Sequence, residues 1–170
     1  MDVQVTPTDI QTANEVLTLL RPFAQEGSAG IELLSRTMEG MRRDLQGYLT
    51  EGTVEIQIGG RKNRVSKKVA AILSTVGGLA DQWRKGPGSD YLVLTVETLD
   101  QWLALFRQRT PVTLTLFSRQ QDAIAISAPG HPGHVTPLGV AILTLLTLNK
   151  ATDELRDHMG RGEDVRLRPV

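Results

Sequence analysis

The first fifty residues carry apolar side chains at steps of three and four, the spacing that places them on one face of a helix. Gly27 interrupts the pattern, which therefore predicts two helices folded back on each other as a hairpin. The spacing is also close to a heptad repeat, which is typical of a seam between helices. We expect residues 1–51 to form a helical arm, and residues 8–49 to form a homo-oligomer, most simply a dimer. The seam positions are Ile10, Ala13, Leu17, Leu20, Ile31, Leu34, Met38, Met41, Leu45, Tyr48 and Leu49.

Beyond Gly52 the pattern changes from helical spacing to alternation. Apolar and polar residues alternate along 53–58, 112–117 and 123–127, which is the period of a β-strand with one buried face. After a loop rich in glycine and proline we expect a fourth strand at 91–96. The expected helices span 66–84, 99–109 and 137–158, and a further loop dense in proline and glycine spans 128–137.

These elements predict an α+β fold. An N-terminal helical hairpin is followed by a mainly antiparallel sheet of about four strands, packed on two to three helices. The last expected helix starts with residues that are apolar on all sides, so we expect it to be buried at the centre. In this arrangement residues 52–160 form the α+β core, and residues 161–170 form a flexible tail.

The composition is that of a globular protein, with 40% hydrophobic and 22% charged residues among 170. The absence of cysteine excludes disulfides, thiolate metal sites and a cysteine nucleophile. The longest apolar stretch, at 138–148, is about half of what a membrane span needs, and the N-terminus does not resemble a signal peptide. We therefore expect a cytoplasmic protein that has no contact with a membrane.

The net charge is zero, but the charges are unevenly spread. Residues 1–52 hold eight acidic and four basic side chains, a balance of −4, whereas residues 53–90 hold three acidic and seven basic ones, a balance of +4. Most of that basic excess falls within eight residues, 61–68, which we expect to form a basic loop after residue 60 that leads into a helix. Clustered cations are typical of surfaces that bind phosphate, so this segment is the strongest functional signal. Its members are Arg61, Lys62, Arg64, Lys67 and Lys68.

The position of these cations favours a particular chemistry. Ser66 is placed to cap a helix, which puts Lys67 and Lys68 in the first helical turn. That end of a helix is positive, so cations are unfavourable there unless an anion is nearby. We predict a nucleic-acid-binding protein, acting as an oligomer, that contacts the phosphate backbone through the five cations. The alternative is a solvated cluster that offsets the acidic N-terminal arm.

His131 and His134 are candidate ligands of a different kind. Two imidazoles can begin a metal site, but a zinc site takes three or four ligands. The nearby residues that could complete such a site are Asp153, Asp157 and His158. We expect no metal and no cofactor, and we keep a small-ligand or metal-dependent protein that uses this loop as an alternative.

Catalytic motifs are missing from the chain. There is no Walker-type phosphate loop, no glycine-rich dinucleotide motif, no nucleophile elbow and no zinc-protease motif. We therefore lean towards a protein that is not an enzyme. The remaining alternative is a structural or regulatory protein-interaction module, viral or inhibitory in kind, that uses its N-terminal helices.

Overall fold

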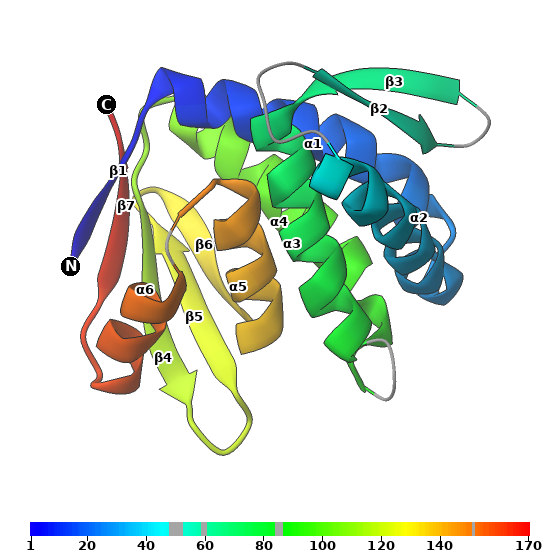
Figure 1. The fold of residues 1–170 in the computed structure, drawn as a ribbon. Helices are drawn as coiled ribbons and strands as arrows, with labels where there is room; N and C mark the ends of the chain where they lie inside the picture. Colours follow the sequence, from blue (N-terminus) through cyan, green and yellow to red (C-terminus); the bar gives the residue numbers. More distant parts are fainter. Residues whose placement is uncertain (48–52, 59–60, 84–86, 151) are drawn as a thin grey trace.

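A sheet with helices on one face makes up one side of the molecule in Figure 1, and a group of helices that carries a β-hairpin makes up the other. This computed structural model describes residues 1–47, 53–58, 61–83, 87–150 and 152–170. The predicted α+β class, with a helical hairpin and a mainly antiparallel sheet packed on helices, is confirmed.

The strands of the sheet are β1 (Asp2–Val5), β4 (Val112–Ser118), β5 (Ala123–Ala128), β6 (His131–Pro137) and β7 (Val165–Pro169). They lie in the order β1-β7-β4-β5-β6. The pair β1 and β7 is parallel, and the other pairs of this sheet are antiparallel. The sheet therefore has an interior strand, β7, that comes from the end of the chain.

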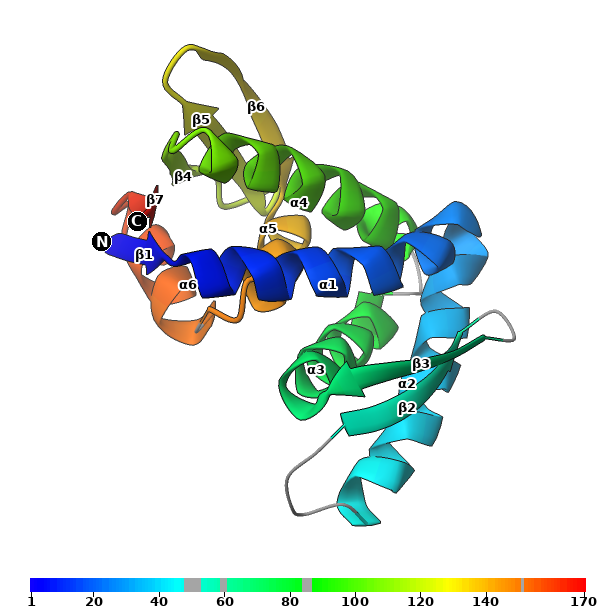
Figure 2. The same cartoon turned by 90° about the horizontal axis from the view of Figure 1, so that it is seen from above.

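Helices cover one face of this sheet, as Figures 1 and 2 show. The helices are α1 (Pro7–Gln25), α2 (Ser28–Gly47), α3 (Lys67–Trp83), α4 (Tyr91–Arg107), α5 (Leu138–Thr147) and α6 (Thr152–Gly160), with a short 3-10 helix η1 (Pro87–Asp90) before α4. Side chains that alternate with the buried ones point away from the helices. Among these, Phe117 and Val135 are 62% and 50% exposed.

The first core lies between the sheet and helices α1, α4, α5 and α6. Trp102 and Phe106 of α4 and Val165 and Leu167 of β7 all belong to this core and are buried. Burying an apolar side chain of this size stabilises a fold by about 1.5–3 kcal/mol. The sheet is therefore held to the helices mainly by aliphatic packing around two aromatic rings.

The second core joins α1, α2 and α3 to a hairpin of β2 (Thr53–Ile58) and β3 (Arg61–Ser66). Figure 2 shows α1 running between the two parts of the molecule. Its Leu17 lies in the first core, and its Leu20 and Phe23 lie in the second. One helix thus contributes a different stripe of side chains to each core.

The N-terminal helices begin and pack as their residues predict. Thr6 and Asp9 form a capping box at the start of α1, in which each side chain accepts a hydrogen bond from the other residue's backbone N–H. The seam positions Leu17, Ile31 and Leu34 are buried in the chain's own cores. The residues near 48–52, where we placed the boundary of the arm, lie outside the described residues, and self-association through residues 8–49 stays a prediction.

The predicted buried helix at 138–148 is confirmed, but it is shorter than expected. Side chains of α5 enter both cores, with Leu145 in the first and Leu143 in the second. Asn149 then adopts a left-handed conformation with φ of 57°, which ends the helix. A separate helix, α6, follows where we expected one helix to continue to residue 158.

The predicted strand at 91–96 is wrong, because α4 already begins at Tyr91. Leu92, Leu99 and Phe106 are spaced by seven residues and are all buried, so one helical stripe runs through the whole segment. Thr95 keeps its hydroxyl satisfied inside this helix by donating to the Tyr91 carbonyl at 2.6 Å. A buried threonine and a neighbouring valine were therefore misleading signs of a strand.

Two further segments differ from expectation because they pair with distant strands. The loop expected at 128–137 contains strand β6, which lies antiparallel to β5. The predicted flexible tail is wrong for Val165–Pro169, which lies between β1 and β4 with Val165 and Leu167 fully buried. Short strands of this kind are stabilised by their neighbours in the sheet, and their own residues give little local signal.

No helix in the described part of the chain has the length and hydrophobicity needed to cross a bilayer.

The start of α5 is tightly packed and gives a test of the fold. A Cβ atom added at Gly139 would overlap the Tyr91 ring, which itself packs edge-on to Trp83 with ring centroids 5.6 Å apart. We expect Gly139→Ala to lower the free energy of unfolding by about 1–3 kcal/mol, because the ring has to move. Gly160→Ala is the matched control, since a Cβ atom there meets no atom within 4 Å. Urea unfolding that gives the two variants equal stability would contradict this packing.

Candidate nucleic-acid interface

The predicted cations lie on the β2–β3 hairpin and on the first turn of α3. The strands β2 and β3 are antiparallel, and Glu55 lies opposite Arg64. The alternate residues of β2, Val54, Ile56 and Ile58, are buried against the helices. The segment we expected to be a basic loop after residue 60 is therefore a strand, because it pairs along its length with an apolar strand that is anchored in the second core.

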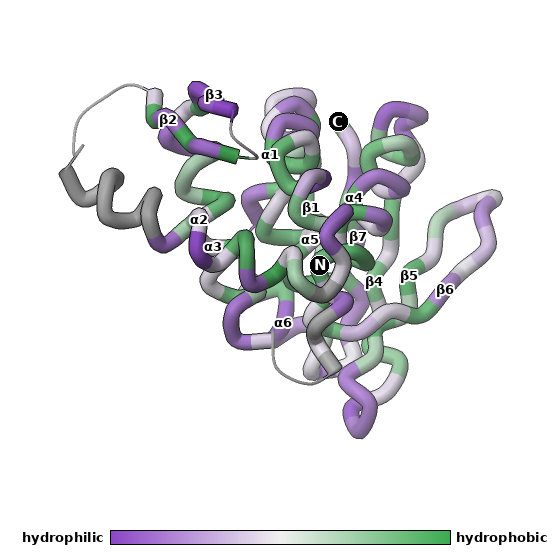
Figure 3. The backbone as a smooth tube through the Cα atoms, turned by 90° about the vertical axis from the view of Figure 1, so that its right-hand side faces the viewer, coloured by the Kyte–Doolittle hydropathy of each residue, from purple (hydrophilic) through white to green (hydrophobic). Residues whose placement is uncertain are grey.

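The register separates the cations of β3 into two groups. Lys62 and Arg64 lie opposite Gln57 and Glu55, on the hairpin face that points away from the core. Arg61 lies opposite the buried Ile58 and so belongs to the other face, although its own side chain is exposed. Figure 3 shows β3 as a hydrophilic strand beside the alternating β2. Lys62 and Arg64 can therefore reach one ligand together, whereas Arg61 approaches it from the rim.

The start of α3 is capped as its sequence predicts. The Ser66 hydroxyl accepts a hydrogen bond of 3.2 Å from the Val69 backbone N–H. Lys67 and Lys68 follow in the first turn, which holds no acidic residue. Both cations therefore lie at the positive end of a 17-residue helix, where a negative ligand would be stabilised and a lysine is not.

The five cations have no anionic partner in the part of the chain that the structure describes. The cationic groups of Arg61, Lys62, Arg64, Lys67 and Lys68 form no ion pair or hydrogen bond with a described residue. Their charges are also not used to hold the hairpin in place, which apolar packing does. The electrostatic attraction of this surface is therefore available to a ligand.

A groove extends the basic surface from α3 towards the end of α5. It has a volume of ≈ 430 Å³, and Lys68 and Lys150 stand on its two sides. Its floor includes the apolar side chains of Ala71, Ile72 and Leu146. Lys150 is 82 positions away in sequence (150 − 68 = 82), so its approach to Lys68 is a product of the fold.

Lys150 is held in this groove by Asp9 of the α1 capping box. Its Nζ donates to Asp9 Oδ2 at 2.7 Å, and the two side chains are only 16% and 13% exposed. Burial alone would raise the pKa of Asp9, but the hydrogen bonds from Lys150 and Thr6 outweigh it and hold that pKa below its usual range. The pair thus fixes one side of the groove and neutralises part of the Lys150 charge.

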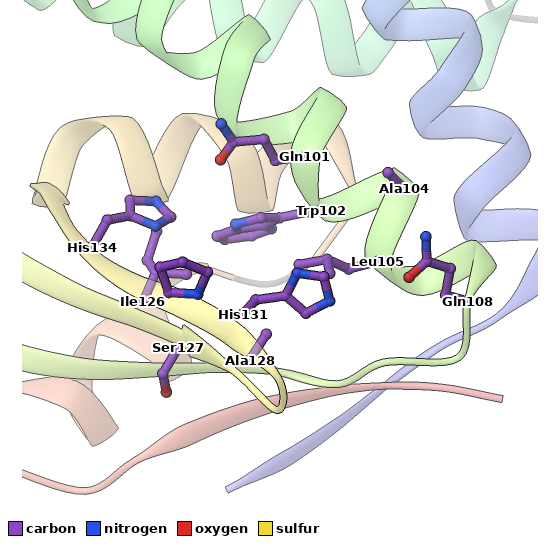
Figure 4. A pocket seen from close by; sticks show the side chains of 11 residues that line it. Gln101, Trp102, Ala104, Leu105, Gln108, Ile126, Ser127, Ala128, His131 and His134 are labelled. Carbon is purple, nitrogen blue, oxygen red and sulfur yellow. The ribbon is translucent and has the colours of Figure 1, made fainter.

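The two loop histidines lie in a different place, on β6. They line a groove between α4 and β5–β6 of ≈ 490 Å³, which we call the α4–β6 groove; its lining comprises Gln101, Trp102, Ala104, Leu105, Gln108, Ile126, Ser127, Ala128, His131, Pro132 and His134. Figure 4 shows His131 and His134 on one side and α4 on the other.

Neither histidine belongs to a metal site in the described part of the chain. No group of three or more histidine or acidic residues lies close enough there to hold a metal ion. His158, which we considered as a third ligand, is instead paired with Glu163, and this contact holds the pKa of Glu163 below its usual range. The metal alternative therefore has no geometric support among these residues.

Comparison of the chain with protein-family models, with curated proteins and with solved structures finds no match. The function has to be inferred from the geometry and the charges of the chain itself.

Sequence reasoning found the cations of β3 and α3 because they lie within eight consecutive residues. It missed Lys150, which carries no local signal and reaches the basic surface only because α5 packs beside α3. It also treated Arg61, Lys62 and Arg64 as one group, whereas the strand register puts Arg61 on the opposite face of the hairpin from the other two.

The Asp9–Lys150 pair predicts a pH dependence of stability. Because the pKa of Asp9 is lower in the folded than in the unfolded chain, the pair contributes stability above the unfolded value of about 3.9, and loses it as the pH falls through the folded value. We expect Asp9→Asn to lower the free energy of unfolding by about 1–2 kcal/mol at pH 7, and the difference from the unmodified chain to shrink between pH 4 and pH 3.

Asp100→Asn is the control for this measurement, because Asp100 forms an exposed ion pair with Arg21. Such pairs contribute little, so this variant should unfold like the unmodified chain. A stability difference for Asp9→Asn that stays constant from pH 7 to pH 3 in urea unfolding would show that the pair does not hold the groove.

Proposed function

We propose that this protein binds nucleic acid through the phosphate backbone. The contact surface is the outer face of the β2–β3 hairpin together with the first turn of α3, with Lys62, Arg64, Lys67 and Lys68 as the main contacts and Arg61 at the rim. The observation that supports the proposal is that five cations lie along β3 and the first turn of α3 without an anionic partner among the described residues.

Charge on this scale favours a polyanion over a small anion. Residues 53–68 hold five basic side chains and one acidic one, a net charge of +4 (5 − 1). The cations are spread along a strand and onto a helix, so successive phosphates of a nucleic-acid strand can each meet one of them. The helix N-terminus adds backbone amides, which are a further phosphate ligand.

The residues on this surface favour backbone contact over base reading. The outward residues of the hairpin are Thr53, Glu55 and Gln57 on β2, and none is an aromatic that could stack on a base. Arg64 lies opposite Glu55, which lowers the local charge without forming an ion pair with it. We therefore propose binding with low sequence preference and with a strong dependence on salt.

The test is fluorescence anisotropy with labelled single- and double-stranded 20-mers of DNA and RNA, at low and near-physiological salt. For four phosphate contacts we expect the logarithm of the binding constant to fall with the logarithm of the salt concentration with a slope of about −3. Lys62→Glu plus Arg64→Glu should weaken binding at least about tenfold at low salt, because two attractive contacts become repulsive.

Arg166→Glu plus Arg168→Glu is the matched control. It makes the same change in net charge, on exposed side chains of β7 at the other side of the molecule. If both double variants bind alike, the attraction is a property of the net charge and the hairpin is not the site. If the unmodified chain does not bind any of the probes at low salt, the proposed function is wrong.

A further inference from the structure

The α4–β6 groove is a second surface, and it is independent of the basic hairpin. Its lining combines apolar side chains, among them Leu105, Ile126 and Pro132, with uncharged polar ones and the two imidazoles. Among the described residues that line it there is no acid, lysine or arginine. A ligand for this groove is therefore recognised by shape, apolar contact and hydrogen bonds, and not by a polyanionic charge.

The strand beside this groove has a free edge. In the described sheet β6 is the last strand and pairs only with β5. The Leu138 N–H donates to the Asp122 carbonyl, in the same register that places Val135 opposite Ala125. Because hydrogen-bonded and non-hydrogen-bonded pairs alternate in an antiparallel ladder, Val135 falls in a non-hydrogen-bonded pair. Its N–H and C=O therefore point to the open side of the sheet.

Proline limits how much of this edge can pair. Pro132 and Pro137 stand on either side of Val135 and have no N–H to donate. An edge strand that is unpaired along its whole length can pair with strands of other chains and aggregate, and prolines in the strand are one way to prevent this. What remains here is a short pairing site with one donor and one acceptor at its centre, directly beside the groove.

The floor of the groove contains an unpaired donor. Trp102 is fully buried, and its indole Nε1 has no hydrogen-bond partner among the described residues. Figure 4 shows its ring between Gln101 of α4 and the histidines of β6. A buried N–H without an acceptor costs about 1–3 kcal/mol, and this N–H becomes available to a ligand acceptor only if the indole ring moves towards the open groove.

We propose that the α4–β6 groove binds a short extended peptide segment of a partner protein, which adds as a strand to β6. The peptide residue that pairs with Val135 would point to the same sheet face as Val135 does. Its two neighbours would then point to the opposite face, and the neighbour beside His134 would enter the groove beneath α4. An apolar side chain at that position matches the lining.

The dimensions of α4 agree with this mode of binding. Gln101 and Gln108 are seven residues apart, or about 10 Å along a helix, which is the span of about three residues of an extended chain. Figure 4 shows Gln101 towards His134 and Gln108 towards the His131 end. Their exposed carboxamides are placed to bond the peptide backbone at each end of the groove. A small compact ligand bound in the groove would not use the strand edge.

The probe for the test is a phage library of random eight-residue linear peptides, selected on the immobilised full chain and followed by anisotropy with the labelled selected peptide. We expect the selected sequences to share an apolar residue. Val135→Pro removes the free N–H and should weaken binding about tenfold, whereas Val135→Thr keeps the N–H and should bind like the unmodified chain.

A second pair of variants tests the groove without touching the strand. Ala104 is exposed on α4 within the groove, and Ala71 is exposed on α3 in the other one. Ala104→Trp should block the peptide, and Ala71→Trp should not. Because Val135→Pro could also disturb the hairpin, the peptide itself is N-methylated at single positions. Methylation of the amide that pairs with Val135 should abolish binding, and methylation of the adjacent amides should not.

Three results would overturn the proposal. One is a library that yields no peptide, and another is a peptide that binds equally well after N-methylation and to Ala104→Trp. The third is a concentration-dependent dimer, lost in Val135→Pro, in a chain that binds no peptide, which would assign the edge to a second copy of this chain. The variant Lys62→Glu plus Arg64→Glu should bind the peptide normally. Failure of the peptide proposal can therefore be distinguished from failure of the nucleic-acid proposal.

Discussion

Helix α1 has to bury two stripes of side chains at once, and the arrangement of the whole chain depends on this. Leu17 is buried beneath the sheet helices, while Leu20 and Phe23 are buried against α2 and α3. Neither core is complete without this helix, so the two parts of the molecule are joined by a shared hydrophobic interface and not by a linker. The Asp9–Lys150 pair adds a fixed contact at the start of the same helix.

This shared burial explains how a two-stranded hairpin can present a charged face. An isolated hairpin of two strands is marginally stable in water. Here Val54, Ile56 and Ile58 pack in the second core, and the outward-facing residues of the hairpin do not take part in it. Cations that would repel one another in a flexible loop are thus held side by side on a rigid strand. Apolar packing in the second core offsets the free energy of repulsion between these cations. This arrangement is typical of binding surfaces.

The sequence was informative where the signal was local and misleading where pairing was distant. The helical spacing of the first fifty residues and the alternation along 53–58, 112–117 and 123–127 predicted elements that the structure contains. The helix at Tyr91 was taken for a strand because its first turns contain valines and a buried threonine. Strands β1 and β7 have few residues, and β6 contains two prolines, so only their partners in the sheet define them. The same limit applied to the site, where Lys67 and Lys68 were visible but Lys150 was not.

The place of β7 in the sheet has a consequence for the order of folding. Its neighbour β1 lies at the other end of the chain, and the Met1 amino group bonds the Asp164 carbonyl across 163 positions. Until residues 165–169 are available, β4 has an open edge and β1 has no partner, whereas the hairpin and α3 make mostly local contacts. We therefore expect the β2–β3 hairpin to form early and the sheet to close last. Contacts of such long range slow folding, and the open edge of β4 makes the unfinished chain a substrate for chaperones and a hazard for aggregation.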